Sequence, residues 1–288
     1  AAVFMIVLFS VLFTRENRPP ESSVVNDVPV AGKTQAVLSL PDGRQVALGN
    51  EKEQDTAWMK YVEACTIESK ATTEPADIKI EVARGGEYKI RLEDGTTVWL
   101  NSESSLIYPE KFTGDKRAVR LSGEGYFEVA RDEKKPFIVS VTDMEIKVLG
   151  TKFNVTAYQD EKMTTTTLIS GAVEVVTPHR SVQLQPGKQA MVQEGDDDIT
   201  VLEVDVELAT SWTAGIFKFD KMALTDICTR LSRWYDIDFV FEGETGKEKF
   251  TGGTWKYVPL KDFLSKIERV TNVLFLFENN TVRVVPKK

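Results

Sequence analysis

Short runs in which apolar and polar residues alternate fill most of the chain between residues 78 and 206. A period of two is typical of β-strands with one buried face, and turn signals such as Gln185-Pro186-Gly187 separate the runs. The candidate strands are Val119–Leu121, Gly125–Val129, Phe137–Val141, Met144–Leu149, Lys152–Tyr158, Thr164–Ile169, Gly171–Val175, Ser181–Leu184, Gln189–Val192 and Ile199–Val204. This spacing predicts an all-β sandwich or solenoid-like domain over residues 36–210, and a barrel fits the same spacing.

One alternating run occurs twice, because Leu38–Leu48 matches Ile90–Leu100 without a gap. Each copy is interrupted by Asp-Gly, a strong hairpin signal, so the two copies are expected to form equivalent hairpins. The pairs expected to face each other are Leu92 with Val98, Ile90 with Leu100, Leu40 with Val46, and Leu38 with Leu48. In each pair the two residue numbers differ by an even number, so the loop contains an odd number of residues. This favours a three-residue turn with a left-handed glycine over a two-residue turn.

The pattern changes at about residue 211, where a helical period appears between short strands. One predicted helix buries Leu224, Ile227, Cys228, Leu231 and Trp234, and a second, at an offset of 36 residues, buries Leu260, Phe263, Leu264, Ile267 and Val270. A final hairpin through Asn279-Asn280 places Phe277 opposite Val282 and Phe275 opposite Val284, as a two-residue type I′ turn requires. We therefore expect a mainly β protein whose residues 211–288 form a small α+β domain of tandem βαβ units.

The chain opens with a continuous apolar run that reaches Phe13. We expect residues 1–14 to be a truncated transmembrane helix, since the run is shorter than a full span and has no polar face. An apolar helix packed on the protein and a signal sequence are the alternatives. Residues 15–35, with Pro19-Pro20 and Ser22-Ser23, are predicted to be a linker.

Composition excludes several functions. A net charge of −8 argues against nucleic-acid binding, and two cysteines with one histidine cannot build a Cys/His metal site. The histidine, His179, lies in a predicted turn between strands, so we expect no catalytic residues, metal or cofactor. A surface carbohydrate-binding or adhesive β-protein is an alternative, with Trp99, Trp212, Trp234 and Trp255 as stacking candidates, and an enzyme with paired carboxylates is a third.

Several unusual peptides occur in a characteristic order from Ile78 to the end. They are Arg91–Asn101, Leu106–Pro109, Leu121–Val129, Lys135–Val139, Val148–Val155, Gly171–Val175, Leu184–Ala190, Ile216–Phe219 and Leu231–Asp236. In these segments the sequence resembles the periplasmic region of the FecR family of anti-sigma factors, in the form with a C-terminal domain similar to the secretin/TonB N-terminus.

This resemblance implies a non-enzymatic regulator anchored in the inner membrane by a single helix, with most of this chain in the periplasm. Its partners would be the N-terminal signalling domain of a TonB-dependent outer-membrane transporter and an extracytoplasmic-function sigma factor. The resemblance places the sigma-binding segment upstream of Ala1, in a cytoplasmic part absent from this chain. In several members the relay proceeds by regulated proteolysis.

A candidate contact surface lies at residues 250–257, where Thr251, Gly253 and Trp255 alternate with Phe250, Gly252, Thr254 and Lys256. An edge strand can gain a strand from a partner, so Phe250, Thr251, Thr254, Trp255 and Lys256 are the predicted partner-binding residues. An ordinary internal strand is the alternative. A charged residue or proline at Thr254 is expected to weaken partner binding without unfolding the chain.

Overall fold

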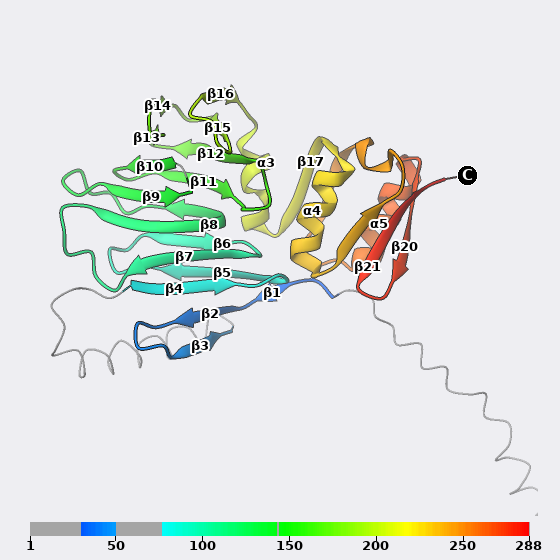
Figure 1. Ribbon diagram of the computed structural model, residues 1–288, viewed down its shortest axis with the longest axis horizontal. Helices are drawn as coiled ribbons and strands as arrows, with labels where there is room; N and C mark the ends of the chain where they lie inside the picture. The colour runs from blue at the N-terminus through cyan, green and yellow to red at the C-terminus, as the bar shows by residue number, and fades with distance from the viewer. Residues whose placement is uncertain (1–29, 50–76, 143, 288) are drawn as a thin grey trace, which may run out of the picture.

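The computed structural model describes residues 30–49, 77–142 and 144–287, which form a β domain followed by a smaller C-terminal domain (Figure 1). The strands of the β domain are β1 (Lys33–Thr34), β2 (Ala36–Ser39), β3 (Gln45–Leu48), β4 (Asp77–Val82), β5 (Gly86–Arg91), β6 (Thr97–Leu100), β7 (Ser104–Pro109), β8 (Arg117–Glu128), β9 (Phe137–Val141), β10 (Met144–Val148), β11 (Lys152–Ala157), β12 (Met163–Ser170), β13 (Val173–Val176), β14 (Ser181–Leu184), β15 (Lys188–Gln193) and β16 (Ile199–Glu203). The predicted helix at residues 1–14 lies outside the described residues. None of the helices in the described ranges is long and apolar enough to cross a membrane.

The β domain is a sandwich of two sheets that share the long strand β8. One sheet has the order β3-β2-β4-β7-β8-β9-β10-β13-β14, and the other has the order β1-β5-β6-β8-β11-β12-β15-β16. The first half of β8 pairs with β7 and β9, and its second half pairs with β6 and β11. The chain adds strands to the two sheets in turn, so the sandwich also has the progressive, solenoid-like order that the strand spacing predicts.

Gly123 marks the point at which β8 passes from one sheet to the other. Its φ is 90°, and a Cβ atom there would lie 2.3 Å from Ser104 Oγ, so a residue with a side chain does not fit. The sequence pattern divides this strand into Val119–Leu121 and Gly125–Val129 because a glycine usually signals a turn. That division is wrong: the pairing continues on both sides of Gly123 along one strand.

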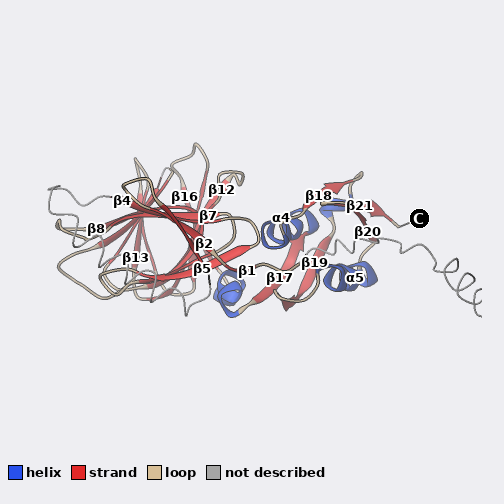
Figure 2. Ribbon diagram, turned by 90° about the horizontal axis from the view of Figure 1, so that it is seen from below, coloured by secondary structure: helices blue, strands red, loops and turns tan. Residues whose placement is uncertain are grey.

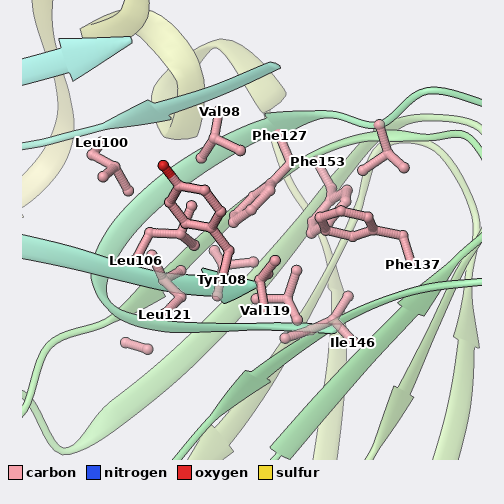
Figure 3. Close-up of a cluster of buried hydrophobic side chains, with 14 of the residues drawn as sticks. Val98, Leu100, Leu106, Tyr108, Val119, Leu121, Phe127, Phe137, Ile146 and Phe153 are labelled. Atoms are coloured by element: carbon pink, nitrogen blue, oxygen red, sulfur yellow. The ribbon is translucent and has the colours of Figure 1, made fainter. Parts of the chain in front are cut away.

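Apolar side chains from both sheets meet in one core (Figure 3). Phe127 and Phe153 of one sheet stack with their ring centroids 5.1 Å apart, and Phe137 of the other sheet approaches Phe127 at 6.3 Å. All three phenylalanines are inaccessible to solvent. Burial of such large apolar side chains is the main favourable contribution to folding, which explains why the alternating pattern persists through so many short strands.

The two repeated runs form equivalent hairpins, as predicted. Gly43 and Gly95 both have positive φ, and Gly95 N donates to Leu92 O across a three-residue loop that closes between Leu92 and Thr96. The predicted pairs are two residues out of register. The observed pairs are Ile90 with Val98, Tyr88 with Leu100, Leu38 with Val46, and Ala36 with Leu48. The odd number of loop residues determines which face of the sheet each residue occupies. The register is set by the loop, which brings Leu92 opposite Thr96 and not opposite Val98.

The last residues of the predicted linker include a strand. Residues 15–29 lie outside the described part, but β1 falls within the predicted range 15–35 and pairs in parallel with β5. Lys33 N donates to Gly85 O and Gln35 N donates to Glu87 O. The last residues of the predicted linker are therefore bound to the edge of the sandwich.

The C-terminal domain consists of two βαβ units, as predicted. Its elements are α3 (Val206–Thr210), β17 (Ile216–Ala223), α4 (Leu224–Tyr235), β18 (Asp238–Phe241), β19 (Lys249–Trp255), α5 (Leu260–Val270), β20 (Val273–Glu278) and β21 (Thr281–Pro286), with short 3-10 turns at Ser211–Ala214 and Thr245–Lys247. Each unit runs from the pair β17-β19 through a helix to the sheet β18-β21-β20. Side chains of α4 and α5 share one core with both sheets, and Figure 2 shows the helices beside them.

The predicted helix faces are correct with one exception. The four apolar residues of α5 from Leu260 to Ile267 are buried, whereas Val270, at the last turn, is exposed and wrong as a core prediction. In the final hairpin Phe277 faces Val282 as predicted. The turn itself departs from type I′, which needs two positive φ angles, because only Asn279 of its two residues has a positive φ.

Candidate functional site

Strand β19, which contains the predicted contact residues, has one unpaired edge. Within the described chain it pairs with β17 alone, in a two-stranded antiparallel sheet. Lys256 N donates to Gly215 O directly after the ladder. Because hydrogen-bonding residues alternate along an antiparallel strand, the N–H groups of Gly253 and Trp255 point away from β17. These backbone groups are available to another strand.

The side chains of this strand alternate as predicted. Thr251 and Trp255 are exposed, with 61% of the Trp255 surface accessible, while Thr254 and Lys256 point inward. Phe250 is half-buried and packs its ring edge-on against Phe219 and Phe263. Of the five predicted contact residues, only Thr251 and Trp255 therefore present their side chains to solvent.

Thr254 supports the fold. It is buried, and its backbone pairs with Phe217 in the β17-β19 ladder. A charge there would be desolvated and a proline would remove a ladder hydrogen bond, so either substitution would disturb the domain itself. The contact of this strand with a partner is better tested at Trp255.

Lys256 lies at the interface between the two domains and is inaccessible to solvent. Its Nζ atom is 2.7 Å from Glu87 Oε2 of β5 and 3.8 Å from the centroid of the Trp234 ring. Burial lowers the pKa of Lys256, and the Glu87 carboxylate opposes that shift. A buried charge is costly unless it is paired, so this ammonium group binds the C-terminal domain to β5.

Glu87 accepts a second hydrogen bond, from Tyr257. The Tyr257 hydroxyl donates to Glu87 Oε1 at 2.8 Å, and its ring meets Trp234 edge-on with the centroids 5.7 Å apart. Burial and the bond to Glu87 raise the pKa of Tyr257 to about 12. Both carboxylate oxygens of Glu87 are thus bound by residues that directly follow the exposed Trp255.

A second basic residue of the C-terminal domain, Arg233 of α4, is buried against the β domain. Its guanidinium binds Asp160 through two hydrogen bonds of 2.7 and 2.8 Å and Glu161 through one of 2.5 Å. Its Nε atom lies 3.3 Å from Glu103 Oε2. Burial alone would lower the pKa of Arg233, but its surroundings, which include Tyr158 and the two acidic residues, raise it.

The β domain contributes a basic residue of its own, Arg84. It donates to the carbonyl oxygens of Ser232 and Ile237 at the end of α4, and it pairs with Asp236 and Asp238. A positive charge beside a helix C-terminus is favourable because the negative ends of the peptide dipoles point there. Arg84, Glu87, Arg233 and Lys256 define what we call the domain interface.

Sequence reasoning did not find the domain interface; it predicted Lys256 as a contact residue for a partner protein, whereas Lys256 binds Glu87 of the same chain. Arg233 matches Arg269 in the internal repeat, but Arg233 is buried and Arg269 is exposed, so the repeat alone does not distinguish them. Arg233 and Asp160 are 73 positions apart, and Lys256 and Glu87 are 169 apart. No local pattern connects residues at such separations.

The residues considered for other functions are dispersed. Trp212 and Trp234 are buried, so they cannot form an exposed stacking surface together with Trp255. The side chain of His179 is 78% exposed. Within the described ranges no group of three His, Cys, Asp or Glu residues is arranged to hold a metal ion. These residues therefore do not form a common site in the described part of the chain.

Comparisons with known proteins found relatives for both domains. Residues 78–174 match the FecR protein family, and residues 216–284 match the family of FecR C-terminal domains. Two crystal structures of a candidate anti-sigma factor from Parabacteroides distasonis, at 1.65 and 2.50 Å resolution, are similar to the chain with 30% sequence identity and TM-scores of 0.68. The alignments cover 73% and 74% of this chain and 99% and 100% of those chains. No curated protein matches the sequence.

Proposed function

The chain belongs to the FecR family of anti-sigma factors, and we propose that it relays a signal from a TonB-dependent transporter of the outer membrane to an extracytoplasmic-function sigma factor. The family is regulatory and implies a sigma factor as a partner. This regulatory role is favoured over the carbohydrate-binding alternative.

In this proposal the chain is anchored in the inner membrane and its folded domains lie in the periplasm. The apolar run up to Phe13 supports the anchor, and the resemblance of the folded part to FecR supports the compartment. The sigma factor would be bound by a cytoplasmic segment that precedes this chain. The transporter would be contacted by the C-terminal domain.

The unpaired edge of β19 is the observation that supports the proposed contact with the transporter. The outward N–H groups of Gly253 and Trp255 offer hydrogen bonds to an added strand, and the exposed Trp255 ring offers apolar surface beside them. We infer that the N-terminal signalling domain of the transporter adds a strand to β19.

Two variants of Trp255 distinguish the contribution of its backbone N–H to binding from the contribution of its side chain. Trp255→Ala removes the ring but keeps the outward N–H, whereas Trp255→Pro removes both and leaves the bonds to β17 in place. Isothermal titration with the transporter's signalling domain should show weakened binding by Trp255→Ala and stronger weakening, of about tenfold or more relative to the alanine variant, by Trp255→Pro.

Trp99→Ala is the matched control, because Trp99 is a partly exposed tryptophan of the β domain, far from β19 along the chain. It should bind like the wild type. Equal affinities for all three variants and the wild type would reject β19 as the contact. Equal losses from the alanine and proline variants would reject strand addition in favour of a contact through the ring alone.

A further inference from the structure

The first described residues of the chain pass through the domain interface. Ala31 packs against the core of the C-terminal domain. Gly32 lies directly on the Trp234 ring, because a Cβ atom at Gly32 would be 2.6 Å from Trp234 Cε3. The next residues form β1 on the edge of the sandwich, and Figure 1 shows β1 at the junction of the two domains.

The same stretch of the β domain holds both β1 and the C-terminal domain. Gly85 O accepts from Lys33 N at 2.9 Å, while Gly85 N donates to Arg233 O at 2.7 Å. Glu87 O accepts from Gln35 N, while the Glu87 carboxylate binds Lys256 and Tyr257. Residues 85 and 87 therefore connect β1 to the domain that carries β19.

Strand β1 is too short to remain in place by itself. It comprises two residues, and a backbone hydrogen bond contributes only about 1 kcal/mol net. The contact of Gly32 with Trp234 and that of Ala31 with the C-terminal core add the packing that the ladder lacks. Removal of the C-terminal domain would eliminate this packing.

Two residues of the interface have backbone conformations that are costly for residues other than glycine. Glu103, which faces Arg233, has a φ of 59°, and Asp236, which pairs with Arg84, has a φ of 48°. Such conformations persist where surrounding contacts maintain them. Contacts within each domain hold both conformations, because Asp236 is the left-handed residue that ends α4 and donates its N–H to Ser232 O, while Glu103 N donates to Ala83 O.

We propose that the C-terminal domain clamps β1 against β5, so that displacement of this domain releases residues 30–35 from the β domain. The biological meaning of this clamp rests on the proposed function: a partner bound at β19 would act on Lys256 and Tyr257, and through Glu87 on the segment that leads to the membrane anchor. The clamp itself is a property of this chain alone and is tested without a partner.

Amide hydrogen exchange of the full chain in detergent micelles measures the clamp, because Lys33 and Gln35 donate the amides that bind β1 to β5. Lys256→Met removes the ammonium group that binds Glu87, and Gly32→Ala forces β1 away from Trp234. Both variants should raise the exchange rates of Lys33 and Gln35 about tenfold or more. The amide of Gly85, which reports contact with Arg233, should exchange faster in parallel.

Lys152→Met is the matched control, since Lys152 is an exposed lysine that pairs with Glu128 within the β domain. It should leave the amides of Lys33, Gln35 and Gly85 unchanged, and the amides of β11 and β21 should stay protected in every variant. If Lys256→Met does not fold, Gly32→Ala tests the clamp from the opposite side, because coupling between two sites is reciprocal.

Two results would overturn the clamp. In the first, the Gly85 amide exchanges faster in the variants while Lys33 and Gln35 keep their wild-type rates, so that β1 stays bound without the C-terminal domain. In the second, none of the three amides responds to either variant, so that Lys256 and Gly32 do not support the interface. Neither result depends on whether a transporter domain binds β19, which titration measures separately.

Discussion

The guanidinium carbon of Arg233 lies 3.6 Å from the centroid of the Tyr158 ring, and the two residues belong to different domains. A cation over an aromatic face gains attraction that is stronger away from water, and Arg233 is almost fully buried. With Asp160 and Glu161 on its other atoms, the guanidinium group is held by the β domain on several sides. One side chain of α4 thus makes several contacts with the β domain.

Arg233→Lys should therefore destabilise the domain interface although it keeps the charge. Lysine has a single nitrogen, so it cannot bind Asp160 and Glu161 through separate atoms as Nη2 and Nη1 do, or place a planar group over Tyr158, and we expect a loss of about 2 kcal/mol in the free energy of unfolding of the C-terminal domain. Urea unfolding measures this loss. Arg230→Lys, on an exposed position of the same helix, is the control and should change stability by less than about 0.5 kcal/mol.

The Lys256–Glu87 pair should show coupling in a double-mutant cycle. Lys256→Met leaves the Glu87 carboxylate with Tyr257 alone, and Glu87→Gln leaves a buried ammonium group without its counter-charge. Each single variant should lose about 2 kcal/mol of stability, and the double variant should lose less than the sum by about 1 kcal/mol or more. Additive losses in urea unfolding would mean that the two groups do not stabilise each other.

Gly123→Ala should be among the most destabilising substitutions in the β domain. The new methyl group would occupy the positions of Ser104 Oγ and Glu103 O, and the residue would keep a φ of 90°. We expect a loss of about 3 kcal/mol in thermal or urea unfolding.

Gly187→Ala distinguishes the cost of atomic overlap from the cost of a positive φ. Gly187 has a φ of 83°, but no atom lies within 4 Å of the added Cβ. It should lose only about 1 kcal/mol, the cost of the backbone conformation. If the two variants were equally stable, close packing where β8 passes between the sheets would not be the reason for Gly123.

Alkaline conditions should destabilise the C-terminal domain through Tyr235. Its hydroxyl proton is shared between Val258 O at 2.7 Å and Lys256 O at 3.1 Å, and burial raises its pKa above the usual value of 10.0. The folded state thus holds the proton more tightly than the unfolded state. The stabilisation is complete below pH 10 and decreases as the pH rises above that value.

Tyr235→Phe should show a smaller loss of stability above pH 10 than the wild type, although it starts from a lower stability because the hydroxyl and its shared hydrogen bond are missing. Urea unfolding at pH values from 9 to 11 compares the slopes. Identical slopes would show that Tyr235 does not titrate during alkaline unfolding.

The hairpins show how far sequence patterns predict the fold. Phe277 and Val282 were correctly paired because a two-residue loop leaves one possible register. In the Leu92 hairpin the pattern predicted the loop length, its left-handed glycine and the buried face, but it placed Leu92 opposite Val98 instead of Thr96. Alternation has a period of two, so a shift by two residues leaves every side chain on the same face.

The candidate site was predictable only in part for a related reason. Alternation along β19 correctly separated Trp255 from its inward neighbours, but exposure of one edge depends on which strands pair, and no local pattern contains that information. The sequence predicts Lys256 as a contact residue because it lies in the candidate edge strand. Its true partner, Glu87, comes from the other domain, and only the folded chain brings the two together.

The position of β1 has a mechanical consequence. The polypeptide enters the fold beside the C-terminal domain, and the whole sandwich between them forms a loop that starts and ends at this junction. Tension applied between Val30 and β19 would thus be borne by the few contacts around Trp234 and Glu87, and it would bypass the phenylalanine core. We expect the sandwich to stay folded under such a force, while the contacts around Trp234 and Glu87 break first.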